Sequence, residues 1–176
     1  MLTALKDRLF QHRLSADARQ QPPPAIPLNF GNARAVIVLF PADEATDRKA
    51  VDKWRDALRK ATNTKIKLAG YFHQSVGATD FGFPAITPAN LNWYGVPQGE
   101  PVEEYRTLEC EILLRLGPPD HRELDYLAVS KDAALKVGPH RPGHPSPYHL
   151  QFDASGTRDL REQLAAIERI FSFTNA

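Results

Sequence analysis

Apolar residues gather into short runs along the chain, and each run predicts one element of a layered fold. Residues Ala35–Phe40 form a continuous, β-branched run that ends at Pro41, a pattern typical of a strand covered on both faces. Four further strands are predicted, the first and the last of them by alternation of apolar and polar positions. They fall at residues 65–72, 110–116, 135–138 and 148–153.

Helices are predicted after the first, third and fifth strands, because apolar residues there recur every three or four positions. All three have a residue at the start that can cap a helix: Thr46, Asp120 and Thr157. A short helix is also expected over residues 101–107. Strands that alternate with helices predict an α/β three-layer sandwich of the Rossmann or flavodoxin-like type. Its mostly parallel five-stranded sheet is expected in the order 2-1-3-4-5.

The first 27 residues differ from the rest of the chain. Leu2, Leu5 and Leu9 recur at helical spacing with Phe10 beside them, and a proline-rich connector follows at residues 20–27. Residues 1–34 contain five basic and two acidic side chains. We therefore expect a basic amphipathic helical arm with its connector over residues 1–27, followed by a single α/β domain over residues 28–176.

Composition narrows the range of functions. The 176 residues include 22 Lys and Arg against 21 Asp and Glu, so no strong field attracts nucleic acid and we expect no DNA partner. No apolar run reaches the roughly 18 residues of a transmembrane segment. Charges interrupt the first eight residues before a signal sequence can form, which favours a cytoplasmic location.

Parallel sheets bind ligands beyond the carboxyl ends of their strands, and this rule selects candidate residues without any motif. Asp43 and His73 follow the first two strands, and either can act as a general base. Lys136, His140 and Arg141 belong to the fourth strand and the loop after it, where they could hold an anion. For all five residues, ordinary surface roles such as helix-end charges and solvated loop residues remain open.

A second candidate lies in the long segment of residues 73–100, which lacks periodicity. Its peptide Asn92-Trp93-Tyr94 could stack on a planar ligand or on a partner side chain. The alternative is a loop plug over the end of the sheet, with the asparagines making turns.

The sequence lacks the motifs of several common binding sites and catalytic sites. The chain has no Walker-type glycine run, no Gly-x-Gly-x-x-Gly and no Gly-x-Ser-x-Gly. The histidines of residues 140–149 have no carboxylate beside them in their loop, so we expect no metal site and no cofactor. Cys110 stands alone between Glu109 and Glu111, which should raise the pKa of its thiol and favour a structural role.

The blocks Ala35–Phe40, Ile66–Phe72, Asn92–Gly95, Leu135–Gly138 and Tyr148–Asp153 occur in an order that resembles a family of small, uncharacterised α/β proteins of Bacteroidota. The resemblance covers about residues 28–172 and implies a cytoplasmic α/β protein, with no activity to transfer. The segment Glu109–Gly138 also resembles, more weakly, the first half of heptosyltransferase-type glycosyltransferases. This likeness implies a fold and not a reaction.

Two functions follow from these observations. The favoured one is a non-catalytic protein-binding or regulatory module that contacts its partner through the arm or the segment 73–100. The alternative is a protein or enzyme that binds a phosphate- or nucleotide-containing small molecule at the carboxyl edge of the sheet.

Overall fold

A computed structural model describes residues 1–173 and contains one sheet in which every neighbouring pair of strands is parallel. The order is β3-β2-β1-β4-β5-β6, so the predicted parallel α/β sheet and the order of its five strands are confirmed. The strands are β1 (Ala35–Pro41), β2 (Lys65–Tyr71), β3 (Ala85–Ile86), β4 (Ile112–Arg115), β5 (Leu135–Pro139) and β6 (Leu150–Phe152).

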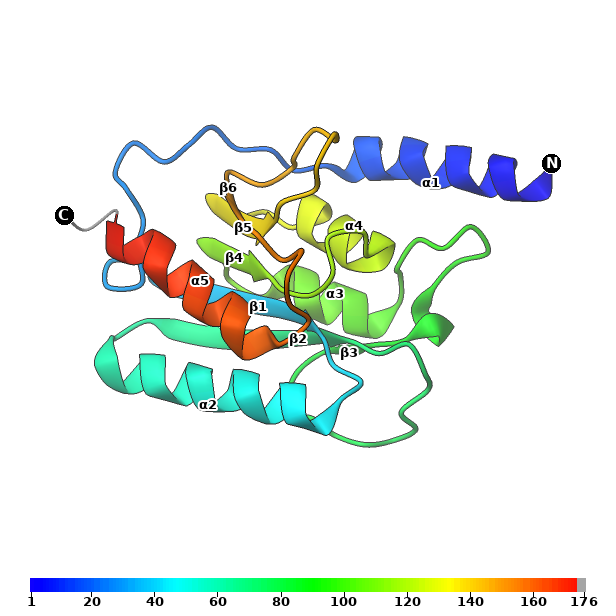
Figure 1. Cartoon of the computed structure of the whole chain (residues 1–176). Helices are drawn as coiled ribbons and strands as arrows, with labels where there is room; N and C mark the ends of the chain where they lie inside the picture. Colours follow the sequence, from blue (N-terminus) through cyan, green and yellow to red (C-terminus); the bar gives the residue numbers. More distant parts are fainter. Residues whose placement is uncertain (174–176) are drawn as a thin grey trace.

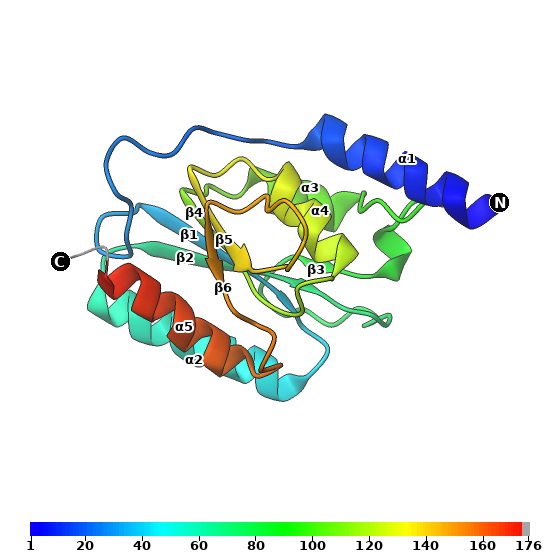
Figure 2. The ribbon, with the colours of Figure 1, turned by 45° about the horizontal axis from the view of Figure 1, so that its top comes forward.

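The helices form layers on both faces of this sheet (Figure 1). They are α1 (Leu2–Asp17), α2 (Ala45–Ala61), α3 (Glu100–Thr107), α4 (Arg122–Ser130) and α5 (Leu160–Phe173), with a short 3-10 helix at Pro88–Asn90. Helices α2 and α5 cover one face, α3 and α4 cover the other, and α1 lies outside α4 (Figures 1 and 2). None of the helices within residues 1–173 is long and apolar enough to cross a membrane.

Alternation along β1 divides the core between the two faces. Val36, Val38 and Phe40 pack toward α2 and α5 in one buried cluster. Ile37 and Leu39 pack toward α3 and α4 in a second cluster. All five side chains are fully buried, which explains why the run carries no polar position although strands normally alternate.

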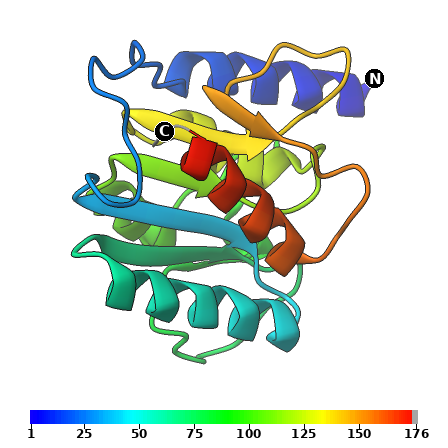
Figure 3. The same cartoon turned by 60° about the vertical axis from the view of Figure 1, so that its left-hand side comes forward.

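The arm packs on its own domain, but not through the predicted leucine stripe. Leu2 and Leu5 are exposed, whereas Phe10 is buried against Tyr126 of α4 and lies 3.8 Å from the guanidinium of Arg122. Leu2 and Leu5 are 64% and 48% exposed near the N-terminal end of α1, the end that extends beyond the sheet in Figure 3, and Leu9 is partly buried. The single large ring one turn further along makes the contact instead.

Two other expectations about local structure were wrong. Strand β3 lies inside the segment expected to be without periodic structure, because two residues are too few to show alternation. The predicted caps are also displaced by one or two residues. Helix α2 begins after Glu44, α4 begins after His121, and the Asp159 carboxylate accepts the N–H of Arg161 at the start of α5.

Candidate functional site at the carboxyl edge of the sheet

Three strand ends bring polar side chains to one edge of the sheet. Asp43 follows β1, His73 follows β2, and His121 lies in the turn between β4 and α4. The chain passes from β1 outward to β2 and β3 and then returns to the other side of β1 for β4. This reversal is the position at which open α/β sheets bind ligands.

The three side chains form a continuous hydrogen-bonded chain. The carboxylate of Asp43 accepts the backbone N–H of His73 at 2.7 Å, and its second oxygen lies 2.6 Å from Nδ1 of the same residue. Nε2 of His73 lies 2.9 Å from Nε2 of His121. His73 is half exposed, whereas the side chain of His121 is nearly fully buried. The chain therefore leads from an open edge into the protein.

The network also assigns the protons. The backbone N–H of Leu124 donates to Nδ1 of His121 at 3.3 Å. With this N–H on the Nδ1 lone pair, a neutral His121 carries its proton on Nε2 and donates it to Nε2 of His73, although the Glu123 carboxylate also lies 3.4 Å from Nδ1. This leaves the His73 proton on Nδ1, where it is donated to Asp43. Both imidazoles are held in defined tautomers by this arrangement.

His121 is kept uncharged by its surroundings. Burial, the nearby Arg115 guanidinium and His73 together lower the pKa of His121 from 6.5 to about 4. Arg115 is fully buried beneath the turn and donates to the carbonyls of Pro118 and His121. Its charge is balanced by Asp125, whose carboxylate lies 2.9 Å away. Arg115 thus fixes the turn that carries His121.

A second arginine fixes the turn that carries Asp43. The guanidinium of Arg48, in the first turns of α2, donates to the carbonyls of Ala42 and Asp43 at 2.6 and 2.7 Å. It is packed over the rings of Phe72 and Phe81. The backbone on both sides of the Asp43–His73 pair is therefore held in place by cations that take no part in the pair itself.

His73 lies at a pocket of about 720 Å³ along the carboxyl edge, which we call the edge pocket. The ends of β1 and β4 and the loop before α5 form its walls, and its charged side chains are Asp47, Asp120 and Arg158. Burial, followed by the charges of Asp159 and Glu44, raises the pKa of Asp47. The volume is that of a small-molecule site.

The structure brings together only part of the predicted set. Asp43 and His73 are paired, but Lys136 lies at the beginning of β5, away from the carboxyl edge, with its ammonium group buried against the carbonyls of Arg19 and Val129. It is therefore not available to hold an anion at that edge. His140 is exposed and lies 2.7 Å from the amide oxygen of Gln151, and Arg141 lines a separate cavity.

The aromatic peptide lies outside the edge pocket. The side chain of Asn92 accepts the N–H groups of Tyr94 and Val96 and so makes the turn. Tyr94 packs with Phe10 of the arm, whereas Trp93 is 58% exposed. The peptide neither plugs the end of the sheet nor lines the pocket there.

Sequence reasoning missed His121 and Arg115. The rule that selected Asp43 and His73 also applies to the strand that ends near Leu116, and it points to the turn containing His121. Arg115 could have been recognised because it is a charged residue within an otherwise apolar strand. For Cys110, the pKa is raised to about 12 as expected in direction, but the main cause is burial and not the neighbouring carboxylates.

The comparisons with known proteins place the chain in a family. A model of a family of unknown function (DUF6913) matches residues 6–167. The chain belongs to this family. No curated protein and no solved structure matches the chain. The DUF6913 match agrees with the expectation of an uncharacterised family, whereas the assignment to Bacteroidota and the heptosyltransferase likeness stay predictions.

The DUF6913 match implies no ligand for this chain, because the function of the family is unknown. Within residues 1–173, no group of three or more His, Cys, Asp or Glu side chains is arranged to hold a metal ion. What the edge pocket offers is an imidazole supported by a carboxylate, together with hydrogen-bonding groups around a cavity.

Proposed function

We propose that the edge pocket binds a small polar molecule and that His73 exchanges a proton with it. The observation that carries this proposal is the chain Asp43–His73–His121, which is assembled from three strand ends beside a pocket. An imidazole whose Nδ1–H is held by a carboxylate is the usual form of a general base, because the carboxylate stabilises the imidazolium that forms.

The charges of the pocket favour an uncharged or cationic ligand. Asp47 and Asp120 line it against Arg158, and Asp43 stands directly behind His73. A phosphate would face these carboxylates, whereas hydroxyl or amino groups can donate hydrogen bonds to them. This preference separates the proposal from a phosphate- or nucleotide-binding site, which was expected from the basic residues of the sequence.

Proton transfer requires the ligand to reach Nε2 of His73. In the free protein this atom accepts the Nε2–H of His121. Because Nε2 has a single lone pair, a ligand hydroxyl donates to it by displacing the His121 N–H, which the half-exposed His73 ring allows. His121 then serves as a positioning residue that keeps the His73 ring oriented when the pocket is empty.

The proposal is tested by titrating ribose, glycerol and ethanolamine, together with ribose phosphate and glycerol phosphate, into isotope-labelled protein. We expect the uncharged or cationic compounds to shift the imidazole signals of His73 and His121 more than their phosphorylated counterparts do. His73→Gln should abolish binding, whereas the control His140→Gln, on an exposed loop outside the pocket, should retain it. Equal or stronger binding of the phosphates, or no shift at these two histidines, contradicts the proposal.

A second role, protein binding, is favoured by one observation. The exposed side chains of Leu2, Leu5 and Trp93 belong to α1 and to the turn beside it, which are joined through Phe10, Tyr94 and Arg122. Large apolar side chains left exposed on one part of a surface are typical of an interface. This role would use the arm and the segment 73–100 and would leave the edge pocket free.

This second role is tested with three versions of the full chain as bait in a native lysate. A partner should be captured by the wild type and by the control Ile26→Ser, which changes an exposed side chain of the connector that is 72% accessible. The double variant Leu5→Ser/Trp93→Ser should lose it. Identical capture by all three chains argues against an interface on this surface.

A further inference from the structure

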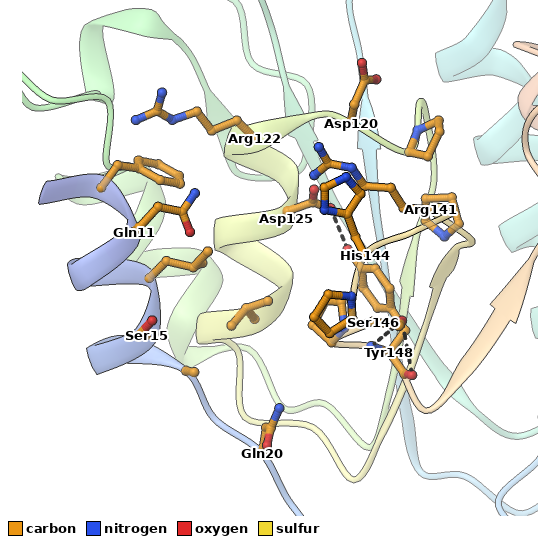
Figure 4. A pocket seen from close by; sticks show the side chains of 18 of the residues that line it. Gln11, Ser15, Gln20, Asp120, Arg122, Asp125, Arg141, His144, Ser146 and Tyr148 are labelled. Carbon is orange, nitrogen blue, oxygen red and sulfur yellow. Dashed lines mark hydrogen bonds between the residues drawn. The ribbon is translucent and has the colours of Figure 1, made fainter. Parts of the chain in front are cut away.

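A second cavity lies between the arm and the domain, separate from the Asp43–His73 pair. It has a volume of about 570 Å³ and is enclosed by α1, by α4 and by the loop between β5 and β6 (Figure 4). We call it the arm cavity. It meets the edge pocket only at Pro119 and Asp120, which line both. Cavities of this size bury most of the surface of a small organic molecule.

The walls of the arm cavity are mainly apolar and are firmly held. Phe10 and Leu14 from α1 and Val129 from α4 form one side. The ring of Tyr148 forms the other side, and its hydroxyl donates to Asp125 at 2.7 Å. Prolines of the β5–β6 loop add further rigid apolar surface. Phe10 and Tyr148 are only 1% and 7% exposed, so most of the accessible apolar surface belongs to Leu14 and the loop prolines.

Most of the charges around this cavity are already neutralised. Arg122 is paired with Asp7 at 2.8 Å, and Asp125 is paired with Arg115. Arg141 differs, because within the described part of the chain its guanidinium has no hydrogen-bond or ion-pair partner. Burial raises the pKa of Asp125, and the charges of Arg115 and, to a smaller extent, Arg141 lower it.

The position of Arg141 suits an acidic group of a ligand. His144 lies on the same tight turn, which is closed by its backbone N–H to the carbonyl of Arg141. Figure 4 shows both side chains beside Asp125 and Tyr148, whereas the Asp120 carboxylate points away from them. An unpaired guanidinium above an apolar cavity favours an anion, because it can donate two parallel hydrogen bonds to a carboxylate, sulfonate or phosphate.

We propose that the arm cavity binds an organic anion with an apolar body, which lies between α1 and the β5–β6 loop and has its acidic group on Arg141. The arm completes this site, since α1 supplies one of its walls. The site differs from the edge pocket in its walls, although Pro119 and Asp120 line both. A ligand bound here also links the arm to the domain.

The probe for this proposal is anilinonaphthalene sulfonate, an aromatic anion that becomes fluorescent in apolar surroundings, and phenylnaphthylamine is its uncharged counterpart. Arg141→Gln should weaken the sulfonate by about tenfold, the worth of one charge-assisted hydrogen bond, and leave the uncharged probe within about twofold. Ser15→Trp, which places a large ring in the cavity from an exposed position of α1, should weaken both probes by about tenfold.

Arg158→Gln is the matched control, because it removes one arginine from the edge pocket and should change neither affinity. Melting temperatures close to that of the wild type show that the variants are folded, since the sulfonate also binds loosened proteins. The proposal is overturned if the folded wild type shows no saturable binding below about 1 mM. It is also overturned if Arg141→Gln and Ser15→Trp both bind the sulfonate as tightly as the wild type does.

Discussion

His121 combines three tasks in one side chain: it begins α4, donates to His73 and remains uncharged inside the protein. The pKa of its imidazole falls from 6.5 to about 4 in the folded state, so the unfolded chain binds the additional proton between these values. The resulting stabilisation is complete above pH 6.5 and is lost as the pH falls through 4.

A substitution that keeps the cap but removes the titrating ring tests this account. In His121→Asn, the amide oxygen can still accept the Leu124 N–H. Between pH 6.5 and 4 the wild type should lose on the order of 3 kcal/mol of unfolding free energy that the variant does not lose. Urea unfolding at a series of pH values measures this difference, and parallel curves for the two proteins would show that His121 does not titrate as described.

Arg115 is the second residue on which the site depends. Its guanidinium is fully buried and has three partners, so its removal leaves the largely buried carboxylate of Asp125 without its ion-pair partner. Arg115→Met should therefore lower the free energy of unfolding by about 3–5 kcal/mol. The control Arg34→Met removes an arginine that is 76% exposed from its pair with Glu111, and it should cost less than about 1 kcal/mol. Similar losses in a urea titration would contradict the difference in burial.

At the scale of elements, the apolar contact between the arm and the domain centres on one buried aromatic ring. Phe10 is 1% exposed, whereas Leu5 is 48% exposed. Replacing a buried phenylalanine by alanine costs about 3–5 kcal/mol, which is enough to release α1 while the sheet stays folded. In Phe10→Ala, amide hydrogen exchange should accelerate across residues 2–17 and remain unchanged in β1 and β4. Leu5→Ala serves as the control, and unchanged exchange in α1 of Phe10→Ala would show that other contacts hold the arm.

Elements with a strong pattern could be predicted from the sequence, and those fixed by a few contacts could not. The continuous apolar run predicts β1, and the helical spacing of Leu160, Leu164 and Ile167 predicts α5, because several residues support each pattern. Strand β3 has only two residues, and the face of α1 is decided by Phe10 and its partners on a helix far away in sequence. Lys136 shows the same limit, since its burial depends on the carbonyls of the connector and α4.

At the scale of the whole molecule, the order of the strands explains why the site could be located before its chemistry was known. A parallel sheet places all carboxyl ends at one edge, so Asp43 and His73 could be selected together. The pairing with His121 could not be derived, because it depends on how far the turn after β4 extends over the edge. The charged side chains that line the edge pocket and the arm cavity likewise come together only in the folded arrangement.

The most direct test of the acid–base site is a long-range proton–nitrogen NMR spectrum of the imidazole rings at neutral pH. The hydrogen-bonded chain predicts that His73 carries its proton on Nδ1 and His121 on Nε2, and that Asp43→Ala releases His73 from this tautomer. A spectrum of the wild type in which His73 carries its proton on Nε2, unchanged in Asp43→Ala, would contradict the site.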